Sequence, residues 1–437
     1  MKRVFISVCL VLSLLSLLLY WTQPDRRSPV PVLYWISQDD ATRRETIRLF
    51  KQWLKDNDLP PVEVKVDNAN KDPTKKLAQG LAGVGADIYD IYSTELELFY
   101  SSGMLMDVTE AGRRLGFSPA ATYPALNGDL ILDGRQYGFP RNVSGSVLWL
   151  NTETFARYGI PEPSYRWTWD EFEEMGKRFV TAANPPGTRE RSYFVQTVSL
   201  FTLRRGLGLS VFNETMTKCI LDDPRNAEVL RRYYRWVTEL HLIPTVAEIN
   251  SMAADASMAG EGTFYLFATG RYAMLYLPRW ALIRLRTQGE LPLRVVEPFH
   301  NGFPNIEFSC GVLGVYQDTK HPVEAVRFLQ FLTSDSFNLF IARSGDSLPP
   351  VPRYVHTEEF MHPPDHPGEW AAQEVFTRAA PELGIAISRS PFVITGVVRR
   401  VDSKIAQSVL AGRLAPEDAG RVEAEQLDTY IQNGIRN

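Results

Sequence analysis

Three short loops carry polar and aromatic side chains directly after apolar runs that predict buried strands. The predicted strands span residues 32–36, 87–92 and 273–277. In open α/β sheets, the loops beyond the carboxyl ends of the strands form the ligand site. We therefore take as candidate binding residues the following members of these loops: Asp39, Tyr92, Thr94, Glu95, Arg279 and Trp280.

Aromatic and polar side chains together could bind an organic ligand, and the family resemblance given below implies that this ligand is a carbohydrate. A sugar presents apolar C–H faces ringed by hydroxyl groups, so its site needs an aromatic side chain for stacking and polar groups for hydrogen bonds. Trp280 fits the stacking role best, because a strand end beside Pro278 is an unusual place for a core tryptophan; packing at the start of a helix is its alternative. The other candidates also have structural alternatives. Asp39 could cap a helix, Glu95 could be a first-turn carboxylate and Arg279 could be a solvated arginine.

No recognisable catalytic apparatus is present. The chain lacks a GxSxG elbow, a Walker loop, an HExxH motif and a CxxC pair. We therefore predict a protein that is not an enzyme, with no catalytic residue and no cofactor. Two carboxylates can flank a glycosidic bond without any sequence motif. A secreted carbohydrate-active enzyme therefore stays open as an alternative.

Half of the histidines lie within eleven residues, at His356, His362 and His366. Imidazoles with neighbouring carboxylates suit zinc or a similar ion, so a metal-ion-binding receptor is the second alternative. The surrounding segment is rich in proline, and an exposed surface loop is the favoured interpretation. No metal site is therefore predicted.

Composition narrows the class of protein. A chain of 437 residues suits two domains. The formal net charge of −4 leaves no basic excess to attract nucleic acid. Beyond Cys9, only Cys219 and Cys310 are available, so a disulfide framework is absent and free buried thiols are favoured over a single bridge.

The N-terminus predicts export. Lys2 and Arg3 precede an apolar run over 4–19, and Tyr20 and Trp21 follow it. This order is that of a secretory signal, which we place at 1–21, with a linker at 22–31. No small-x-small cleavage site follows. As a helix, residues 4–21 would span about 27 Å, which is marginal for a bilayer. The segment is therefore a signal peptide or an uncleaved anchor that holds the protein at the outer face of the membrane.

The rest of the chain predicts an α/β fold. Strands are expected at 32–36, 62–66, 87–92, 145–151, 273–277 and 310–316. Helix starts are expected at Asp72-Pro73, Thr168, Asp223-Pro224, Pro322 and Pro416. Strands that alternate with helices imply βαβ units and a mainly parallel sheet.

Five groups of segments, in order, carry a resemblance to a known family. They are GADIYD at 85–90 with SGMLMDV at 102–108; YGFP at 137–140 with VLWLN at 147–151 and WTWDEF at 167–172; FATGRYAM at 267–274 with Trp280; PVEAVRFL at 322–329 with 345–349; and VLAGR at 409–413 with PEDA at 416–419. Together they resemble the bacterial extracellular solute-binding proteins of family 1, which include maltose-binding protein.

The resemblance implies a type II periplasmic-binding fold, in which two α/β lobes are joined by a hinge with a ligand cleft between them. By similarity, the chain crosses between lobes near 141–144, near Gly262 and near 310–314. Lobe 1 is then expected at 32–140 and 264–309, and lobe 2 at 141–263 and 310–437.

The resemblance also implies ligand contacts. Trp280 stands at the position of a sugar-stacking tryptophan in the family, and Asp39 at that of a ligand-binding aspartate. Thr94 and Glu95 replace an Asp-Arg pair of the maltose receptor, which argues against maltose specificity.

Four further candidates follow from approximate position in the family. Asn142 and Ser144 lie at the first crossing, and Phe201 and Arg399 lie in the second lobe. The protein is thus expected to be a monomeric, extracytoplasmic sugar-binding protein of an ABC importer, which delivers its ligand to the membrane permease.

Overall fold

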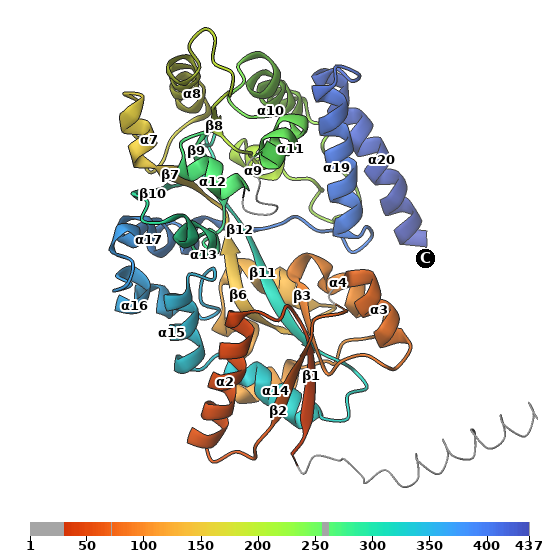
Figure 1. Cartoon of the computed structure of the whole chain (residues 1–437). Helices are drawn as coiled ribbons and strands as arrows, with labels where there is room; N and C mark the ends of the chain where they lie inside the picture. The colour runs from red at the N-terminus through yellow and green to blue at the C-terminus, as the bar shows by residue number, and fades with distance from the viewer. Residues whose placement is uncertain (1–29, 71, 256–261, 437) are drawn as a thin grey trace, which may run out of the picture.

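Two β-sheets, each covered by helices, organise the chain (Figure 1). The computed structural model describes residues 30–70, 72–255 and 262–436. The predicted export segment 1–21 and most of the predicted linker lie outside these residues. Within the described part, no helix has the length and apolar character needed to cross a membrane.

The first sheet has the strand order β12-β11-β3-β1-β2, and β6 pairs with β11. Its strands are β1 (Val32–Ile36), β2 (Glu63–Asp67), β3 (Ile88–Tyr92), β6 (Phe139–Gly145), β11 (Ile306–Val315) and β12 (Gly384–Ala386). β1 runs parallel to β2 and β3, as the alternation of strands and helices predicted. β11 runs antiparallel to both β3 and β6.

The second sheet has the order β10-β7-β9-β8. Its strands are β7 (Val147–Asn151), β8 (Tyr193–Val195), β9 (Tyr272–Leu277) and β10 (Leu293–Val296), and a separate short hairpin joins β4 (Ile131–Leu132) to β5 (Arg135–Gln136). Only β8 and β9 are parallel; β7 is antiparallel to both of its neighbours. The predicted mainly parallel arrangement therefore holds for the first sheet and is wrong for the second, because apolar periodicity carries no information about strand direction.

Strand pairing also corrects the expected division into lobes. β9 and β10 lie within 264–309, which was assigned to lobe 1, yet they pair with β7 and β8 in the second sheet. Conversely, α14 (Pro322–Phe331), assigned to lobe 2, packs on α2 and β11 of the first lobe. The motifs were correctly read as strands and helices, but their partners are set by long-range hydrogen bonds.

The crossings between the sheets lie at other positions than expected. The first falls at Ser146, between β6 and β7, where one strand over 145–151 was predicted. A Cβ on Gly145 would come within 2.7 Å of the Phe308 ring, so this close approach of β6 to β11 requires glycine. The other crossings follow β10 and β12, whereas 310–314 lies inside β11 of the first sheet.

In the first lobe, α3 begins at the predicted Asp72-Pro73 and α14 at the predicted Pro322. Asp40 caps α2 by accepting from the Arg43 backbone N–H, and Asp72 caps α3. The helices are α2 (Ala41–Asp56), α3 (Pro73–Leu81), α4 (Leu96–Ser101), α5 (Thr109–Leu115), α6 (Asn127–Leu130) and α14, with short 3-10 turns at η1 (Ser93–Glu95), η2 (Pro119–Ala121) and η3 (Pro124–Leu126).

Helices of the second lobe cover its sheet at the top of Figure 1. Thr168 forms the predicted capping box with Glu171. The helices are α7 (Thr152–Arg157), α8 (Trp169–Ala183), α9 (Leu200–Gly206), α10 (Pro224–Tyr234) continued by the π-helical turn η4 (Arg235–Glu239), α11 (Val246–Asp255), α12 (Gly262–Ala268), α13 (Ala281–Leu285) with η5 (Arg286–Gln288), α19 (Thr395–Leu410) and α20 (Pro416–Arg436).

Residues 335–378, here called the strap, connect the two lobes on one side of the molecule (left in Figure 1). α15 (Asp335–Ser344) packs against α2 of the first lobe, and α17 (Trp370–Arg378) packs against β10 of the second. Between them lie η6 (Pro352–His356), α16 (Glu358–Met361) and η7 (Pro367–Glu369), and α18 (Ala380–Leu383) follows. One apolar cluster accordingly includes Tyr123 of the first lobe, Trp149 of the second and Phe376 of the strap.

Both cysteines of the described chain are free and buried, as predicted. Burial raises the pKa of the Cys219 thiol to about 12 and raises that of Cys310 further. The buried thiols therefore stay protonated and act as small apolar groups.

A buried ion cluster holds the helices of the second lobe together. Arg204 of α9 donates to Glu423 of α20 and to Asp402 of α19, both at 2.8 Å, and to Asn226 of α10 at 3.0 Å. Burial raises the pKa of Glu423 to about 8, although the charge of Arg204 opposes the rise. Folding therefore favours the protonated form of this carboxyl group.

We predict that this proton makes the stability of the protein depend on pH. The folded pKa of Glu423 exceeds its ordinary value of 4.5, so its contribution is complete below about pH 4.5 and is lost as pH rises through about 8. Glu423→Gln mimics the protonated form, and its stability relative to the wild type should increase between pH 5 and 8.5. Urea unfolding across this range measures the difference. A difference that does not change with pH would contradict the prediction.

Candidate functional site: the strand ends and the crossing between lobes

Asp90 of β3 is the centre of a buried polar cluster at the carboxyl ends of β1 and β3. The Ser37 hydroxyl donates to Asp90 Oδ2 at 2.6 Å, and Arg141 Nε donates to Asp90 Oδ1 at 2.9 Å. Arg43 Nη2 lies 3.5 Å from Oδ2, and Arg43 Nε donates to Ser37 Oγ at 3.2 Å. One carboxylate thus joins the loop after β1, helix α2 and strands β3 and β6.

The surrounding charges keep Asp90 ionised. Burial would raise the pKa of Asp90, but the guanidinium groups of Arg141 and Arg43 and the Ser37 hydroxyl hold it below its usual value. Lys76 Nζ donates to the backbone carbonyl of Asp90, and burial lowers the pKa of Lys76. The cluster therefore fixes both the side chain and the backbone of the strand that leads into η1.

Asp346 extends this cluster to the strap. Its Oδ2 lies 3.8 Å from Arg43 Nη1 and 3.9 Å from Arg141 Nη1, and Asn142 Nδ2 donates to its Oδ1 at 3.0 Å. Ser144, two residues after Asn142, also contacts the strap, because its hydroxyl group lies 3.3 Å from that of Ser347. Asn142 and Ser144, predicted at the first crossing, are thus in β6, where they bind the strap.

The predicted residues after β1 and β3 surround the same sheet edge. Asp40, not Asp39, caps α2; the exposed Asp39 instead pairs with Arg44 at 2.7 Å. Tyr92 is 59% exposed and available for stacking. Glu95 Oε2 accepts from the Tyr92 backbone N–H at 3.3 Å, in agreement with its structural alternative, and Thr94 lies between them in η1.

Trp280 lies at the start of α13, directly beyond the carboxyl end of β9. Its indole is partly exposed and meets the Phe264 ring edge-on at 6.4 Å. One part of the ring is therefore supported by the second lobe while another part remains accessible, which is the arrangement that a stacking residue needs.

Arg279 corrects the sequence interpretation. It is fully buried and donates to Gln373 Oε1 at 2.8 Å and to the backbone carbonyls of Ser347 and Ala342, both at 2.9 Å. A side chain shielded from solvent cannot contact a ligand that enters from solvent. Neither the expected ligand contact nor the solvated alternative holds. The strap covers the residues that follow β9, so Arg279 is shielded from solvent there.

A second polar cluster lies where β11 leaves the second lobe. Ser199, the N-cap of α9, donates to Glu307 Oε2 at 2.7 Å, and the hydroxyl groups of Thr202 and Tyr276 lie 2.6 Å apart. Burial raises the pKa of Glu307, opposed by the Ser199 hydrogen bond and the charge of Arg399. Hydroxyl groups and a carboxylate thus gather at the crossing.

The remaining second-lobe candidates lie near this cluster. Phe201 is partly exposed in the first turn of α9, beside Thr202. Arg399 is exposed on α19, and its charge acts on Glu307. α19 also lies against η1, so the structure brings Arg399's helix close to the Tyr92 loop of the first lobe.

Sequence reasoning missed the groups that organise the site, namely Ser37, Asp90, Ser199, Glu307 and Asp346. Asp90 and Glu307 had a usable signal, because each is an ionisable residue inside an otherwise apolar strand, IYDIY or IEFSCGVLGV. A buried ionisable group is costly unless it has hydrogen-bond or charge partners, so each of these residues signals a polar cluster around it. Asp90 and Glu307 both have such partners in the structure.

The three histidines do not form a metal site. His356 and His362 are exposed, and His362 Nδ1 lies 2.7 Å from Glu358 Oε2 while its ring packs edge-on against Trp370. Across the described ranges, no group of three His, Cys, Asp or Glu residues could hold a metal ion.

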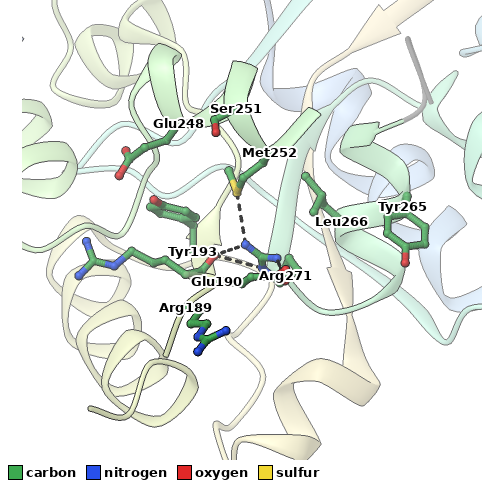
Figure 2. Close-up of a pocket in the computed structure, with 10 residues that line it drawn as sticks. Arg189, Glu190, Tyr193, Glu248, Ser251, Met252, Tyr265, Leu266 and Arg271 are labelled. Carbon is green, nitrogen blue, oxygen red and sulfur yellow. Dashed lines mark hydrogen bonds and ion pairs between the residues drawn. The ribbon is translucent and has the colours of Figure 1, made fainter. Parts of the chain in front are cut away.

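Figure 2 shows a pocket of about 390 Å³ elsewhere in the second lobe. Arg271 occupies its middle and donates to the Arg191 carbonyl at 3.1 and 2.9 Å, with Tyr193 and Met252 beside it. The residues that line this pocket include none of the predicted binding residues. It lies at the amino end of β9, about 20 Å of strand away from Trp280.

We predict that Asp90→Asn destabilises the protein by about 3 to 5 kcal/mol, because it removes the carboxylate nearest to the buried Arg141 and leaves only Asp346, 3.9 Å away, to oppose that charge. Asp39→Asn is the matched control, and its loss of an exposed ion pair should cost under about 1 kcal/mol. Urea unfolding of both variants tests this. Equal effects would show that the Asp90 cluster contributes no more than a surface pair.

Comparison with known proteins places the chain in a family. Residues 43–337, well over half of the chain, match the family model described as bacterial extracellular solute-binding protein. An arabinooligosaccharide-binding protein of Halalkalibacterium halodurans is 26% identical over 152 residues. That match spans 35% of this chain and only 32% of the relative's length.

Solved structures share the fold at low sequence identity. An ABC substrate-binding protein from Listeria monocytogenes, in complex with cycloalternan, has a TM-score of 0.74 and 20% identity, and the match covers 92% of this chain and 99% of that one. The maltose-bound MalE3 of T. maritima has a TM-score of 0.73 and 16% identity, covering 92% and 100%. Together with the family match, the two-lobed α/β architecture leads to one conclusion: the chain belongs to the bacterial extracellular solute-binding proteins.

Proposed function

We propose that this protein reversibly binds a carbohydrate between its two lobes and delivers it to the permease of an ABC importer. The observation that carries the proposal is the partly exposed indole of Trp280 just beyond β9, in the residue next to Arg279, which binds the strap. The contacts are continuous: Arg279, next to Trp280, binds the Ser347 carbonyl, and the Ser347 hydroxyl meets Ser144 of β6.

This combination of groups favours a sugar over an apolar or a strongly charged solute. The indole of Trp280 and the exposed ring of Tyr92 offer faces for C–H groups. Hydroxyl groups at the crossing can both donate to and accept from sugar hydroxyls, and carboxylates there can accept from them. The name of the curated relative, an arabinooligosaccharide-binding protein, supports the same class of ligand. The replacement at Thr94 and Glu95 supports a sugar other than maltose.

Three crossings between the lobes provide the route to closure. The chain passes between the sheets after β6, after β10 and after β12. Rotation about such crossings brings two lobes together over a ligand without disturbing either sheet. Because η1 and α19 already lie against each other in this structure, we infer that opening separates them and that closure restores the surface that a permease recognises.

We further propose that residues 1–21 direct export and, if uncleaved, tether the protein at the outer face of the membrane. The charged-then-apolar order of this segment supports the proposal. A monomer that binds and releases its solute unchanged, without a cofactor, is consistent with membership of a family of binding proteins.

We predict that Trp280→Ala weakens sugar binding at least about tenfold, since loss of a stacked aromatic removes more than about 1.4 kcal/mol. A thermal-shift panel of sugars and polyols first identifies the ligand, because a solute that binds the folded state raises its stability. Titration followed by tryptophan fluorescence then gives the Kd of each variant.

Trp370→Ala is the matched control, because Trp370 is 43% exposed on α17, beyond the polar clusters of the site. It should bind sugar as the wild type does. Undiminished binding by Trp280→Ala would remove this residue from the site. Hydrolysis of a glycoside by the pure protein would instead move it to the enzymes, and stabilisation by zinc alone would favour the metal receptor.

A further inference from the structure

Arg279 has an unusual environment for a buried arginine. Its side chain is completely shielded and stacks on the Phe360 ring, 4.1 Å from the ring centre. Burial lowers the pKa of Arg279 to about 9. Within the part of the chain that the structure describes, it forms no ion pair, whereas Arg141 and Arg204 are each bound to a carboxylate.

The acceptors of Arg279 come from different parts of the strap. Ala342 lies in the last turn of α15, which packs on the first lobe; Gln373 lies in α17, which packs on the second. The third acceptor is the carbonyl of Ser347, in the loop between α15 and η6. The guanidinium of Arg279 therefore connects the segment that follows β9 to α15 at one end of the strap and to α17 at the other.

The loop that Arg279 holds is strained. Gly345 and Ser347 adopt positive φ angles of 77° and 60°, and for serine this conformation is uncommon. The loop is held from the other side by β6, since Val143 and Leu348 exchange backbone hydrogen bonds at 2.9 and 2.8 Å. It is thus fixed between Arg279 and β6.

A contribution to stability alone does not account for this arginine. Burying an uncompensated cation is costly, and an apolar side chain of similar volume would usually stabilise the fold as well or better. A guanidinium does offer one property that an apolar side chain lacks: its rigid planar fork fixes several acceptors relative to one another. Here the guanidinium belongs to the residue next to Trp280, and one of its acceptors belongs to Ser347, whose hydroxyl meets Ser144.

We propose that Arg279 is a positioning residue that holds Trp280 and the loop 345–348 in a single arrangement across the lobes. Solute binding then depends on Arg279 although its side chain never touches the solute. This inference rests on the proposed binding role of Trp280.

The test compares Arg279→Met with Gln373→Leu, which removes one acceptor and leaves the arginine in place. Phe50→Leu is the control, because Phe50 is fully buried in the apolar cluster of the first lobe beneath α14 and should lower thermal stability without touching the site. The Kd for the sugar found in the panel should rise about tenfold in Arg279→Met and a few-fold in Gln373→Leu. It should stay unchanged in Phe50→Leu.

A wild-type Kd in Arg279→Met would overturn the inference, as would an equal loss of affinity in Phe50→Leu at a matched drop in Tm. Should Arg279→Met fail to fold, Gln373→Leu decides, and a wild-type Kd there overturns the inference.

Amide hydrogen exchange separates this inference from the proposed function. Arg279→Met should exchange at least about tenfold faster than Phe50→Leu at 277–282 and 345–348, without any ligand. If the wild type binds no sugar, the proposed function fails and this measurement still decides about Arg279. Equal exchange in the two variants would overturn the positioning role.

Discussion

The loop 345–348 is the constraint on which the rest of the structure depends. It is held on one side by the charges of Arg43 and Arg141 through Asp346, and on the other by the guanidinium of Arg279 through the Ser347 carbonyl. The first two arginines belong to the first lobe and Arg279 to the second. The elements that carry Asn142, Ser144 and Trp280 are therefore tied to this loop by direct side-chain or backbone contacts of their own residues or of a neighbouring residue.

Charge burial explains why these contacts are specific. Asp90 and Asp346 lie among arginines that each need them, so none of the partners can move alone without leaving a buried charge unpaired. Glu307 and Ser199 form a similar contact at the crossing. Such clusters contribute little net stability, but they allow few alternative arrangements. A binding site built from loops and strand ends needs this restriction, because the loops themselves have little apolar surface to pack.

The candidate residues illustrate what local sequence can and cannot decide. Trp280 was identified from its position after an apolar strand, and the structure leaves its indole partly exposed there. Arg279 has the same local signal one residue earlier, yet it is fully buried, because the strap covers that side of the strand end. Asp39 was a possible helix cap by sequence, yet its neighbour Asp40 caps α2, because the backbone places the Asp40 side chain at the Arg43 N–H. The histidine segment, interpreted from sequence as an exposed loop, instead forms η6, α16 and η7, with Val355 and Phe360 fully buried.

The sequence by itself determined the bounds of β1, β2, β3 and β9 to within one residue and the starts of α3, α8, α10, α14 and α20. It also determined that the cysteines are free and the family whose fold the chain adopts. These properties depend on capping residues, apolar periodicity and ordered motifs, all of which are local. Tertiary structure alone decided that β9 and β10 belong to the second sheet, that β11 runs antiparallel, and that Asp90, Arg141 and Asp346 meet. Those outcomes depend on hydrogen bonds and ion pairs between residues tens to hundreds of positions apart, and no local pattern encodes such partners.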